Sequence, residues 1–324
     1  MTAPLLCLDG LRVAFPAGNG EVEALRGVDL SIGPGECLGL VGESGSGKSL
    51  SAFATMGLLP TQARVTGGKV MFAGHDLLEM NEREMERLRG NDLSMIFQEP
   101  MTALNPVMHV GEQIGAPLRR HLGLSRKAAR ERAIEQLDLV GIPDPGVRVD
   151  NFPHEMSGGM RQRTMIAMAL ACEPRLLIAD EPTTALDTTI QAQIIELLNR
   201  LRSELGLSIL MITHDLGVVA EMADRVAVMY GGQVVEECPV ADLFDDPLHP
   251  YSKGLLRSTP DIDMPADSRL ATISGAVPHL TELPSGCTFH PRCPESLDIC
   301  SKQQPLEIRL GDSRRVACWA RDGS

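Results

Sequence analysis

Three features are missing from this chain of 324 residues, and each absence argues against a class of protein. The chain lacks a basic excess, because its net charge is -13, which argues against a nucleic-acid surface. It lacks an uncharged apolar run of about 18 residues, since the best candidate is interrupted by Glu173 and Arg175. It also lacks the basic start of a signal peptide. We therefore expect a soluble, cytosolic protein that reaches a membrane only through a partner.

The composition that remains is that of a folded protein with a core. Hydrophobic residues make up 43% of the chain and charged residues 23%. The length allows one large domain and a smaller one. After Ser258 the periodic pattern gives way to a segment punctuated by prolines. We therefore predict a main domain at residues 1–258, a linker at 259–285 and a small cysteine-rich extension at 286–324.

The hydrophobic pattern of the main domain predicts an α/β fold. Residues 5–15 and 22–32 alternate apolar and polar side chains, as paired antiparallel strands do. Residues 110–140 have a helical pattern. A βαβ series then follows, with a strand at 176–179, a long helix at 188–205 and a strand at 208–212. This order predicts a parallel sheet with an antiparallel β region and a helical subdomain.

Residues 42–49, which read Gly-Glu-Ser-Gly-Ser-Gly-Lys-Ser, follow a strand-like apolar run. Glycines at this spacing allow backbone N–H groups to wrap a polyphosphate, Lys48 reaches the β and γ phosphates, and the Ser49 hydroxyl binds Mg²⁺. By itself the segment predicts only that ATP or GTP binds. The residues expected to bind the nucleotide are Gly42, Glu43, Ser44, Gly45, Ser46, Gly47, Lys48 and Ser49.

Polar side chains follow three other apolar runs. Asp180 and Glu181 end one of them, and a buried parallel strand delivers such carboxylates to the edge of the sheet where a ligand binds. We expect Asp180 to hold Mg²⁺ and Glu181 to polarise the attacking water. His214 is expected to bond to the γ-phosphate and the water, and Gln98 to contact Mg²⁺ or the water. The alternative is that these groups are solvated or structural side chains.

A further segment, Ser157-Gly158-Gly159, precedes an amphipathic helix. It presents the free N–H groups and positive dipole of a helix start, which bind phosphate. Because it has no nucleotide loop of its own nearby in sequence, we expect a second subunit to complete its site. The alternative is a glycine-rich helix entry without a ligand.

In this order the segments resemble the nucleotide-binding subunits of ATP-binding cassette (ABC) transporters. The matching segments are Walker A at 42–49, the Q-loop at Gln98, the signature at 156–160, Walker B at 176–181, the D-loop at Ala185-Leu186-Asp187, the switch histidine His214 and the adenine-stacking position Phe15. The resemblance covers about residues 5–258 and implies a RecA-like phosphate-loop core. It also implies a Mg²⁺-dependent ATPase that dimerises head to tail around two ATP molecules. Each ATP would lie between Walker A of one subunit and Ser157, Gly158 and Gly159 of the other.

Two positions depart from the usual pattern of this family. Met160 replaces the common glutamine of the signature, which removes a side-chain amide but leaves the serine and the glycine backbone. Phe15 replaces the commoner tyrosine and can still stack on adenine. Because Glu181 and His214 are both present, we expect ATP hydrolysis.

The chain also resembles one branch of this family, the peptide and nickel importers. The resemblance lies in residues 97–106, residues 110–114, the triplet His249-Pro250-Tyr251 and the cysteine-containing tail. The resemblance implies an ATPase that energises import of dipeptides or oligopeptides through two separate permease subunits, which residues 99–114 would contact. It implies a location at the cytoplasmic face of the inner membrane, a second ATPase subunit (a paralogue or a second copy) and an extracytoplasmic peptide-binding protein. Import of nickel or another small solute, export, and a soluble ABC ATPase acting on ribosomes or DNA remain alternatives.

Four of the eight cysteines, Cys287, Cys293, Cys300 and Cys318, are crowded into the tail. In a reducing cytosol such a cluster indicates a metal site before it indicates disulfides. Their spacing lacks the C-x₂-C pairs of zinc ribbons, so zinc, an iron–sulfur cluster and free thiols all remain open. The family resemblance implies a [4Fe–4S] cluster on all four thiolates. We expect this module to be independent of the phosphate loop.

Overall fold

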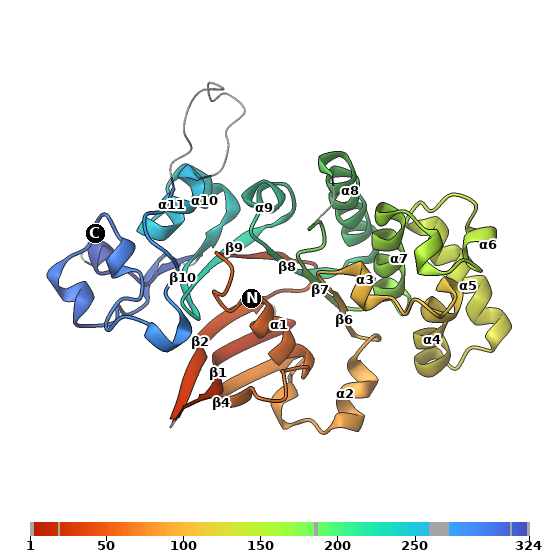
Figure 1. Ribbon diagram of the computed structural model, residues 1–324, viewed down its shortest axis with the longest axis horizontal. Coiled ribbons are helices and arrows are strands. Elements are labelled where there is room, and N and C mark those ends of the chain that lie inside the picture. The colour runs from red at the N-terminus through yellow and green to blue at the C-terminus, as the bar shows by residue number, and fades with distance from the viewer. Residues whose placement is uncertain (1–2, 19, 185–186, 259–271, 312, 323–324) are drawn as a thin grey trace. The chain divides into compact units, whose positions relative to one another are not determined.

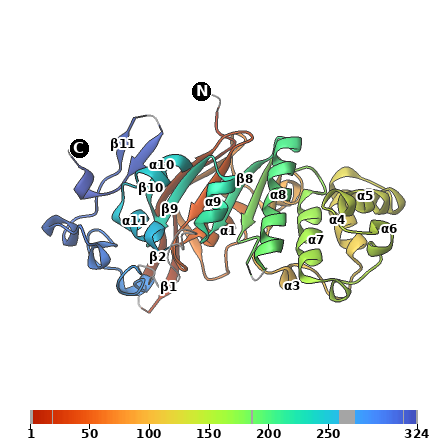
Figure 2. The same ribbon diagram turned by 90° about the horizontal axis from the view of Figure 1, so that it is seen from above.

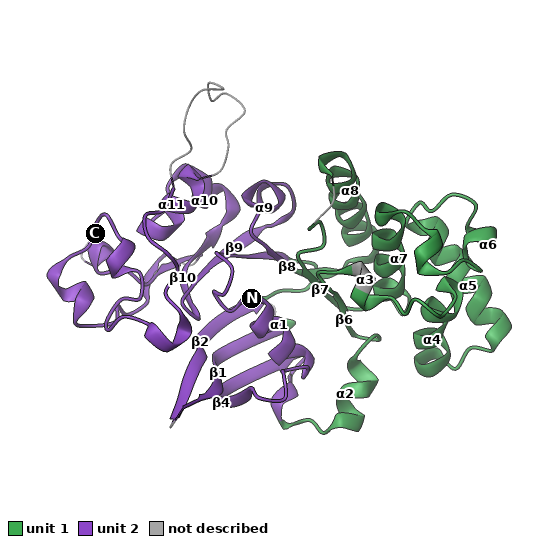
Figure 3. Cartoon of the chain, viewed as in Figure 1, with its two compact units in different colours: residues 1–5, 32–36, 79–211 green, residues 6–31, 37–78, 212–324 purple. Residues whose placement is uncertain are grey.

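The computed structural model describes residues 3–18, 20–184, 187–258, 272–311 and 313–322. The chain divides into two compact units, each built from separate stretches of sequence (Figure 3). Unit 1 comprises residues 1–5, 32–36 and 79–211; unit 2 comprises residues 6–31, 37–78 and 212–324. The phosphate loop, His214 and the cysteine-rich extension therefore belong to unit 2. The predicted domain boundaries near residues 258 and 286 stay predictions.

Unit 2 contains two groups of paired strands and four α-helices among its described residues. Its elements are β1 (Leu6–Ala17), β2 (Gly20–Ile32, ending at the unit boundary), β3 (Cys37–Val41), α1 (Lys48–Met56), β4 (Arg64–Phe72), β5 (His75–Asp76), α9 (Leu216–Met222), β9 (Arg225–Tyr230), β10 (Gln233–Pro239), α10 (Val240–Asp245), α11 (Pro250–Arg257), β11 (Ile308–Leu310) and β12 (Arg314–Val316). The first group is a sheet in the order β2-β1-β4-β5, in which β1 and β4 run antiparallel. This sheet confirms the antiparallel region predicted from the alternating pattern.

The second group of unit 2 has the order β11-β12-β10-β9-β3. All five residues of β3 are buried, and β3 runs parallel to β9, as a strand covered on both faces should. Strands β9 and β10 form a hairpin, which turns at Gly231 and Gly232 with φ of +55° and +79°. These left-handed values explain why two glycines occupy the turn.

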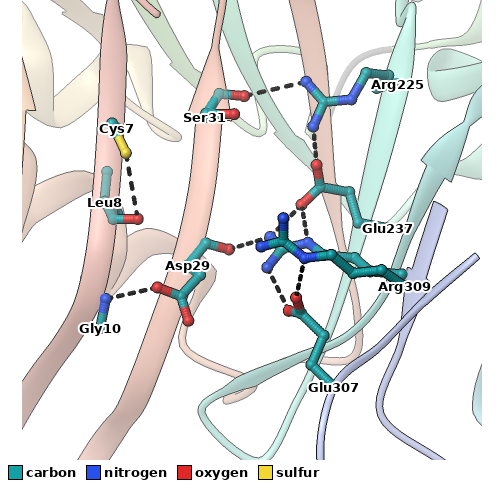
Figure 4. Close-up of polar contacts among 10 residues, drawn as sticks. Cys7, Leu8, Gly10, Asp29, Ser31, Arg225, Glu237, Glu307 and Arg309 are labelled. Atoms are coloured by element: carbon teal, nitrogen blue, oxygen red, sulfur yellow. Dashed lines mark hydrogen bonds and ion pairs between the residues drawn. The ribbon is translucent and has the colours of Figure 1, made fainter. Parts of the chain in front are cut away.

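The extension joins this group through a short hairpin, β11 and β12, that the sequence pattern does not reveal. Strand β12 pairs with β10, and the Arg315 guanidinium bonds to the carboxylates of Glu237 and Glu307. Glu237 also forms an ion pair with Arg225 (Figure 4). Because Glu237 is only 4% exposed, this charge is buried among cationic partners, and the network fixes the extension to β10.

Unit 1 combines parallel strands with a group of helices (Figure 1). Its elements are α2 (Glu82–Leu88), β6 (Leu93–Ile96), α3 (Pro100–Ala103), α4 (Val110–Leu122), α5 (Arg126–Leu139), α6 (Pro145–Arg148), α7 (Gly158–Leu170), β7 (Leu176–Asp180), α8 (Thr188–Leu205) and most of β8 (Ser208–Thr213). Strands β6 and β7 pair in parallel, and α4, α5 and α7 pack on one another (Figure 2). These features confirm the predicted parallel strands and helical subdomain.

Helix ends in the structure follow the capping residues. Ser125 accepts a hydrogen bond from Ala128 N at 3.2 Å and caps the start of α5. Helix α1 ends at Met56, because Gly57 takes a left-handed conformation with φ of +62°. No helix among the described residues is long and apolar enough to cross a membrane.

Candidate functional site

The phosphate loop connects β3 to α1, and its backbone requires glycine at two points. Gly42 has a φ of +154°, and a Cβ there would lie 2.3 Å from the carbonyl oxygen of Met229. Gly47 has a φ of +106°, and a Cβ there would lie 2.7 Å from Leu25 Cδ2. Any side chain at either position would displace the loop. The loop leads directly into a helix N-terminus, an arrangement that binds phosphate.

Two buried polar side chains inside the loop suit a polyphosphate ligand. Lys48 is 5% exposed, and its Nζ donates to the carbonyl oxygens of Gly42 at 2.8 Å and Glu43 at 3.1 Å. Within the described residues the buried Ser46 hydroxyl has no hydrogen-bond partner. A buried hydroxyl without a partner is costly, and phosphate oxygens would supply the missing acceptor. The loop therefore fits the ligand that its sequence predicts.

His214 follows β8 and borders the same cavity as the start of the phosphate loop. The cavity has a volume of about 200 Å³, and its lining residues are Val41, Gly42, Glu43, His214, Leu216, Leu255 and Ser258. The chain is fixed on both sides of the histidine: Asp215 N donates to Thr213 Oγ1 at 3.0 Å, and the Asp215 carboxylate caps α9. The structure thus brings the predicted switch histidine to the predicted phosphate loop within unit 2.

Glu181 and Gln98 meet in unit 1, where the parallel strands β6 and β7 end. Gln98 Nε2 donates to Glu181 Oε2 at 2.8 Å, and Thr184 Oγ1 donates to the same oxygen at 2.8 Å. Glu181 has a φ of +47°, a strained conformation for a residue with a side chain. Asp180, which precedes it, is 3% exposed. The two strand ends thus place an amide and a carboxylate together.

The signature segment forms the start of α7. Ser157 caps the helix by accepting a hydrogen bond from Met160 N at 3.3 Å, and Ser157 and Gly158 are exposed. A Cβ on Gly159 would lie 3.2 Å from Ile190 Cγ2, so this glycine allows α7 to approach α8 closely. The exposed helix N-terminus is available to a phosphate from outside the subunit.

The structure also places two other predicted residues, Asp187 and Phe15. The Asp187 carboxylate caps α8 by accepting from Ile190 N at 2.9 Å; Ala185 and Leu186 of the same D-loop lie outside the described residues. Phe15 is half-buried in β1, in the same unit as the phosphate loop. Their predicted roles toward the nucleotide stay predictions.

Comparisons with known proteins decide which family these features belong to. The model of the ABC transporter family matches residues 25–184, and the model of the oligopeptide/dipeptide transporter C-terminal region matches residues 235–300. The chain is 50% identical over 319 residues to the dipeptide transport ATP-binding protein DppD of Bacillus subtilis, covering 98% of this chain and 95% of that protein. The chain belongs to the ABC transporter ATP-binding proteins. It is an ABC ATPase.

Two further comparisons place this ABC ATPase in the same family. The chain is 52% identical over 315 residues to the oligopeptide transport ATP-binding protein OppD of Salmonella typhimurium, covering 97% of this chain and 93% of that protein. Among solved structures, a dimeric post-hydrolysis state of the ATP-binding cassette MJ0796 bound to ADP and Pi matches with a TM-score of 0.66. It is 29% identical and covers 72% of this chain and 98% of that one. The likeness to this cassette confirms the predicted α/β phosphate-loop fold.

Sequence reasoning missed three residues that hold the site of this ABC ATPase in place. Gln162 is 2% exposed and donates to the carbonyl oxygen of Pro182, so it joins α7 to the chain after Glu181. Tyr251 and Arg292 both bond to Glu43 of the phosphate loop. A buried glutamine in an amphipathic helix gave no signal by itself. Tyr251 and Arg292 stood in segments that indicated only the importer branch.

The structure does not support the predicted metal site as it stands. No group of three or more His, Cys, Asp or Glu side chains among the described residues is arranged to hold a metal ion. The pKa of Cys293 is raised to about 11, mainly by burial and to a smaller extent by negative charge on Cys318, Cys287 and Cys300. None of the eight cysteines, all of them within the described ranges, forms a disulfide.

Proposed function

We propose that this ABC ATPase drives the import of dipeptides or oligopeptides through separate permease subunits. The observation that carries the proposal is the sequence identity to known relatives. About half of the residues, over nearly the whole chain and its tail, are identical to those of ATP-binding proteins of dipeptide and oligopeptide transport. The match of residues 235–300 to the C-terminal region of such transporters supports it. A phosphate loop alone would not identify the cargo, because proteins that act on many different cargoes share it.

In unit 2 we assign the nucleotide-binding groups. The N–H groups of residues 42–49 would bind the phosphates, Lys48 would neutralise the β and γ phosphates, and Ser49 would bind Mg²⁺. Phe15 would stack on adenine, and His214 would bond to the γ-phosphate. The buried Ser46 hydroxyl without a partner and the cavity shared by His214 and Gly42 support these assignments.

In unit 1 we assign the groups that act on Mg²⁺ and water. Asp180 and Gln98 would complete the Mg²⁺ shell, and Glu181 would activate the water that attacks the γ-phosphate. Phosphoryl transfer depends mainly on positioning and on neutralising charge. The contact of Gln98 with Glu181 supports a shared role for these two side chains. Ser157, Gly158 and Gly159 of a second ATPase subunit, a paralogue or a second copy, would supply the remaining phosphate contacts, with Asp187 near them.

We assign residues 99–114 as the surface that contacts a permease subunit. Val107 is 79% exposed and Met108 37% exposed, so the segment offers apolar side chains to a partner. The segment is also held in shape: Gln113 is 7% exposed, and its amide bonds to the backbone of Asn105 and Met108. Such a contact would place the subunit at the cytoplasmic face of the inner membrane.

The proposal predicts that cargo stimulates the ATPase of the assembled transporter. The chain would be purified with its two permease subunits in lipid nanodiscs, and ATP turnover measured with a cognate binding protein. The binding protein loaded with a dipeptide or oligopeptide should raise turnover several-fold over the empty binding protein. Stimulation by nickel or another small solute, with none by peptides, would favour that alternative cargo and contradict peptide import.

We also propose that the four-cysteine extension binds a [4Fe–4S] cluster. The donor set supports it, because four thiolates within one small module suit such a cluster, and none is consumed by a disulfide. Because the described side chains are not arranged around a metal position, the thiols would have to turn toward a common centre. No step of ATP hydrolysis is assigned to the cluster.

Anaerobically purified protein should contain about four irons per chain and absorb broadly near 400 nm, roughly as one cubane requires. Cys318→Ser should lose most of this iron. Cys172→Ser is the matched control, because Cys172 belongs to unit 1, and it should keep the iron. One zinc per chain without iron would support the zinc alternative, whereas four freely titrating thiols without metal would leave the extension as a structural appendage.

A further inference from the structure

The side chain and the backbone of Glu43 are both held by residues that lie far away in the sequence. Arg292 of the extension donates from Nη1 to Oε2 at 2.7 Å and from Nη2 to Oε1 at 2.9 Å, a bidentate pair. The backbone N–H of Glu43 donates to the hydroxyl of Tyr251 at 2.8 Å. Glu43 is the second residue of the phosphate loop, so the loop is clamped where it leaves β3.

Arg292 is itself fixed, so the clamp is not a loose surface ion pair. Its side chain is only 6% exposed. Nε donates to the carbonyl oxygen of Ser274 at 3.0 Å, Nη1 also reaches the Tyr230 hydroxyl at 3.4 Å, and the guanidinium lies 5.8 Å from the centre of the Tyr230 ring. A planar guanidinium used on several sides in this way cannot be replaced by a lysine ammonium. Breaking one partner of such a pair leaves a poorly solvated charge.

Aromatic side chains connect the clamp to β9 and α11. Tyr230, Tyr251 and Phe289 have ring centres 4.7 to 5.3 Å apart, and each is at most 1% exposed. Phe289 lies between Cys287 and Cys293 in the sequence, and both cysteines pack against this cluster. The cluster therefore joins the cysteine-containing segment, through Tyr251 and Arg292, to the loop that is expected to bind phosphate.

We propose that Arg292 is a positioning residue for nucleotide binding. By holding Glu43, it fixes the start of the phosphate loop and makes the affinity for Mg·ATP depend on the C-terminal extension. Glu43 also lines the cavity that His214 borders, so a shift of this residue changes the space beside the loop. The inference rests on nucleotide binding at the phosphate loop, which belongs to the proposed function, but it does not depend on the transported cargo.

The test measures Mg·ATP binding and hydrolysis by the full-length chain. Wild-type binding is measured first, because failure there would contradict the assigned nucleotide site rather than the role of Arg292. Arg292→Ala is expected to weaken Mg·ATP binding and raise the KM for ATP about tenfold, while kcat changes less than about twofold, because Glu181 and His214 are untouched. Arg292→Lys should restore little. Arg309→Ala is the matched control: Arg309 lies in the same extension, is 79% exposed, pairs with Glu307 and should leave both constants unchanged.

A double-mutant cycle separates positioning from general support of the fold. Glu43→Ala should weaken binding to a similar extent, and the double variant should bind no worse than either single variant, because each substitution breaks the same contact. If Arg292→Ala does not fold, Glu43→Gln, which keeps the size of the side chain but removes its charge, is expected to show the same loss. Wild-type affinity in either folded variant, or fully additive losses in the cycle, would overturn the proposal.

Discussion

Replacing Glu181 by glutamine is expected to lower ATP turnover at least about tenfold, the low end for loss of a general base, and to trap an ATP-bound dimer. Glutamine has nearly the same size and keeps an acceptor oxygen for the 2.8 Å contacts from Gln98 and Thr184, so the local geometry should persist. What is lost is the negative charge that polarises the water. Turnover would be measured by phosphate release, and the dimer by size-exclusion chromatography with light scattering.

The matched control for this exchange is Glu196→Gln, which makes the same chemical change on an exposed face of α8 in the same unit. It should leave turnover unchanged. If Glu181→Gln turns over ATP at nearly the wild-type rate, Glu181 is not the residue that activates the water. If Glu181→Gln is slow but stays monomeric with ATP, the substitution has removed hydrolysis without trapping the ATP-bound dimer.

The second large effect is expected at the signature. Ser157→Arg should abolish ATP-driven dimerisation while leaving Mg·ATP binding by the isolated subunit within about twofold of wild type, because the proposed signature site acts on the nucleotide of the other subunit. The arginine would place a long side chain at the exposed helix N-terminus and remove the cap to Met160. Dimerisation is best measured in the Glu181→Gln background, where hydrolysis does not dissolve the dimer.

Ser125→Arg is the control for this experiment, because Ser125 is also an exposed capping residue, which accepts from Ala128 N. Both variants should lose a similar capping energy of about 1 kcal/mol, but only the Ser157 variant should lose dimerisation. Loss of nucleotide binding by the Ser157→Arg monomer would mean that the segment acts within its own subunit or supports the fold.

The local parts of the fold could be predicted because each has a local cause. The run Cys37–Val41 is uniformly apolar and forms a strand whose five residues are all buried. Residues 188–205 are flanked by the capping residues Asp187 and Gly206 and form a helix with the predicted ends. The hairpin β11–β12 was not foreseen, because each strand has only three residues, too few to show a period. It is held instead by ion pairs such as Arg315 with Glu237, which link distant residues.

The residues of the candidate site also fall into two groups, those that the sequence could predict and those that it could not. The phosphate loop, His214, Gln98 and Glu181 each follow a recognisable strand, and the structure brings His214 to the loop and Gln98 to Glu181. The contact of Arg292 with Glu43 joins residues separated by 249 positions, and no periodicity or spacing reports such a pair. The extension therefore contacts the phosphate loop within one unit, against the expectation that the two lie in separate modules. The arrangement of four thiols around a metal also could not be derived, because spacing alone does not fix where side chains point.

Uptake of a labelled dipeptide into sealed vesicles tests the central claim most directly. The chain would be reconstituted with its permease subunits and second ATPase, with the peptide-binding protein on the opposite face. We predict that Mg·ATP on the side of this chain drives accumulation of the dipeptide. Glu181→Gln complexes and complexes given a non-hydrolysable analogue should show none. Accumulation that proceeds equally without ATP hydrolysis, or hydrolysis that moves no peptide, would contradict the account.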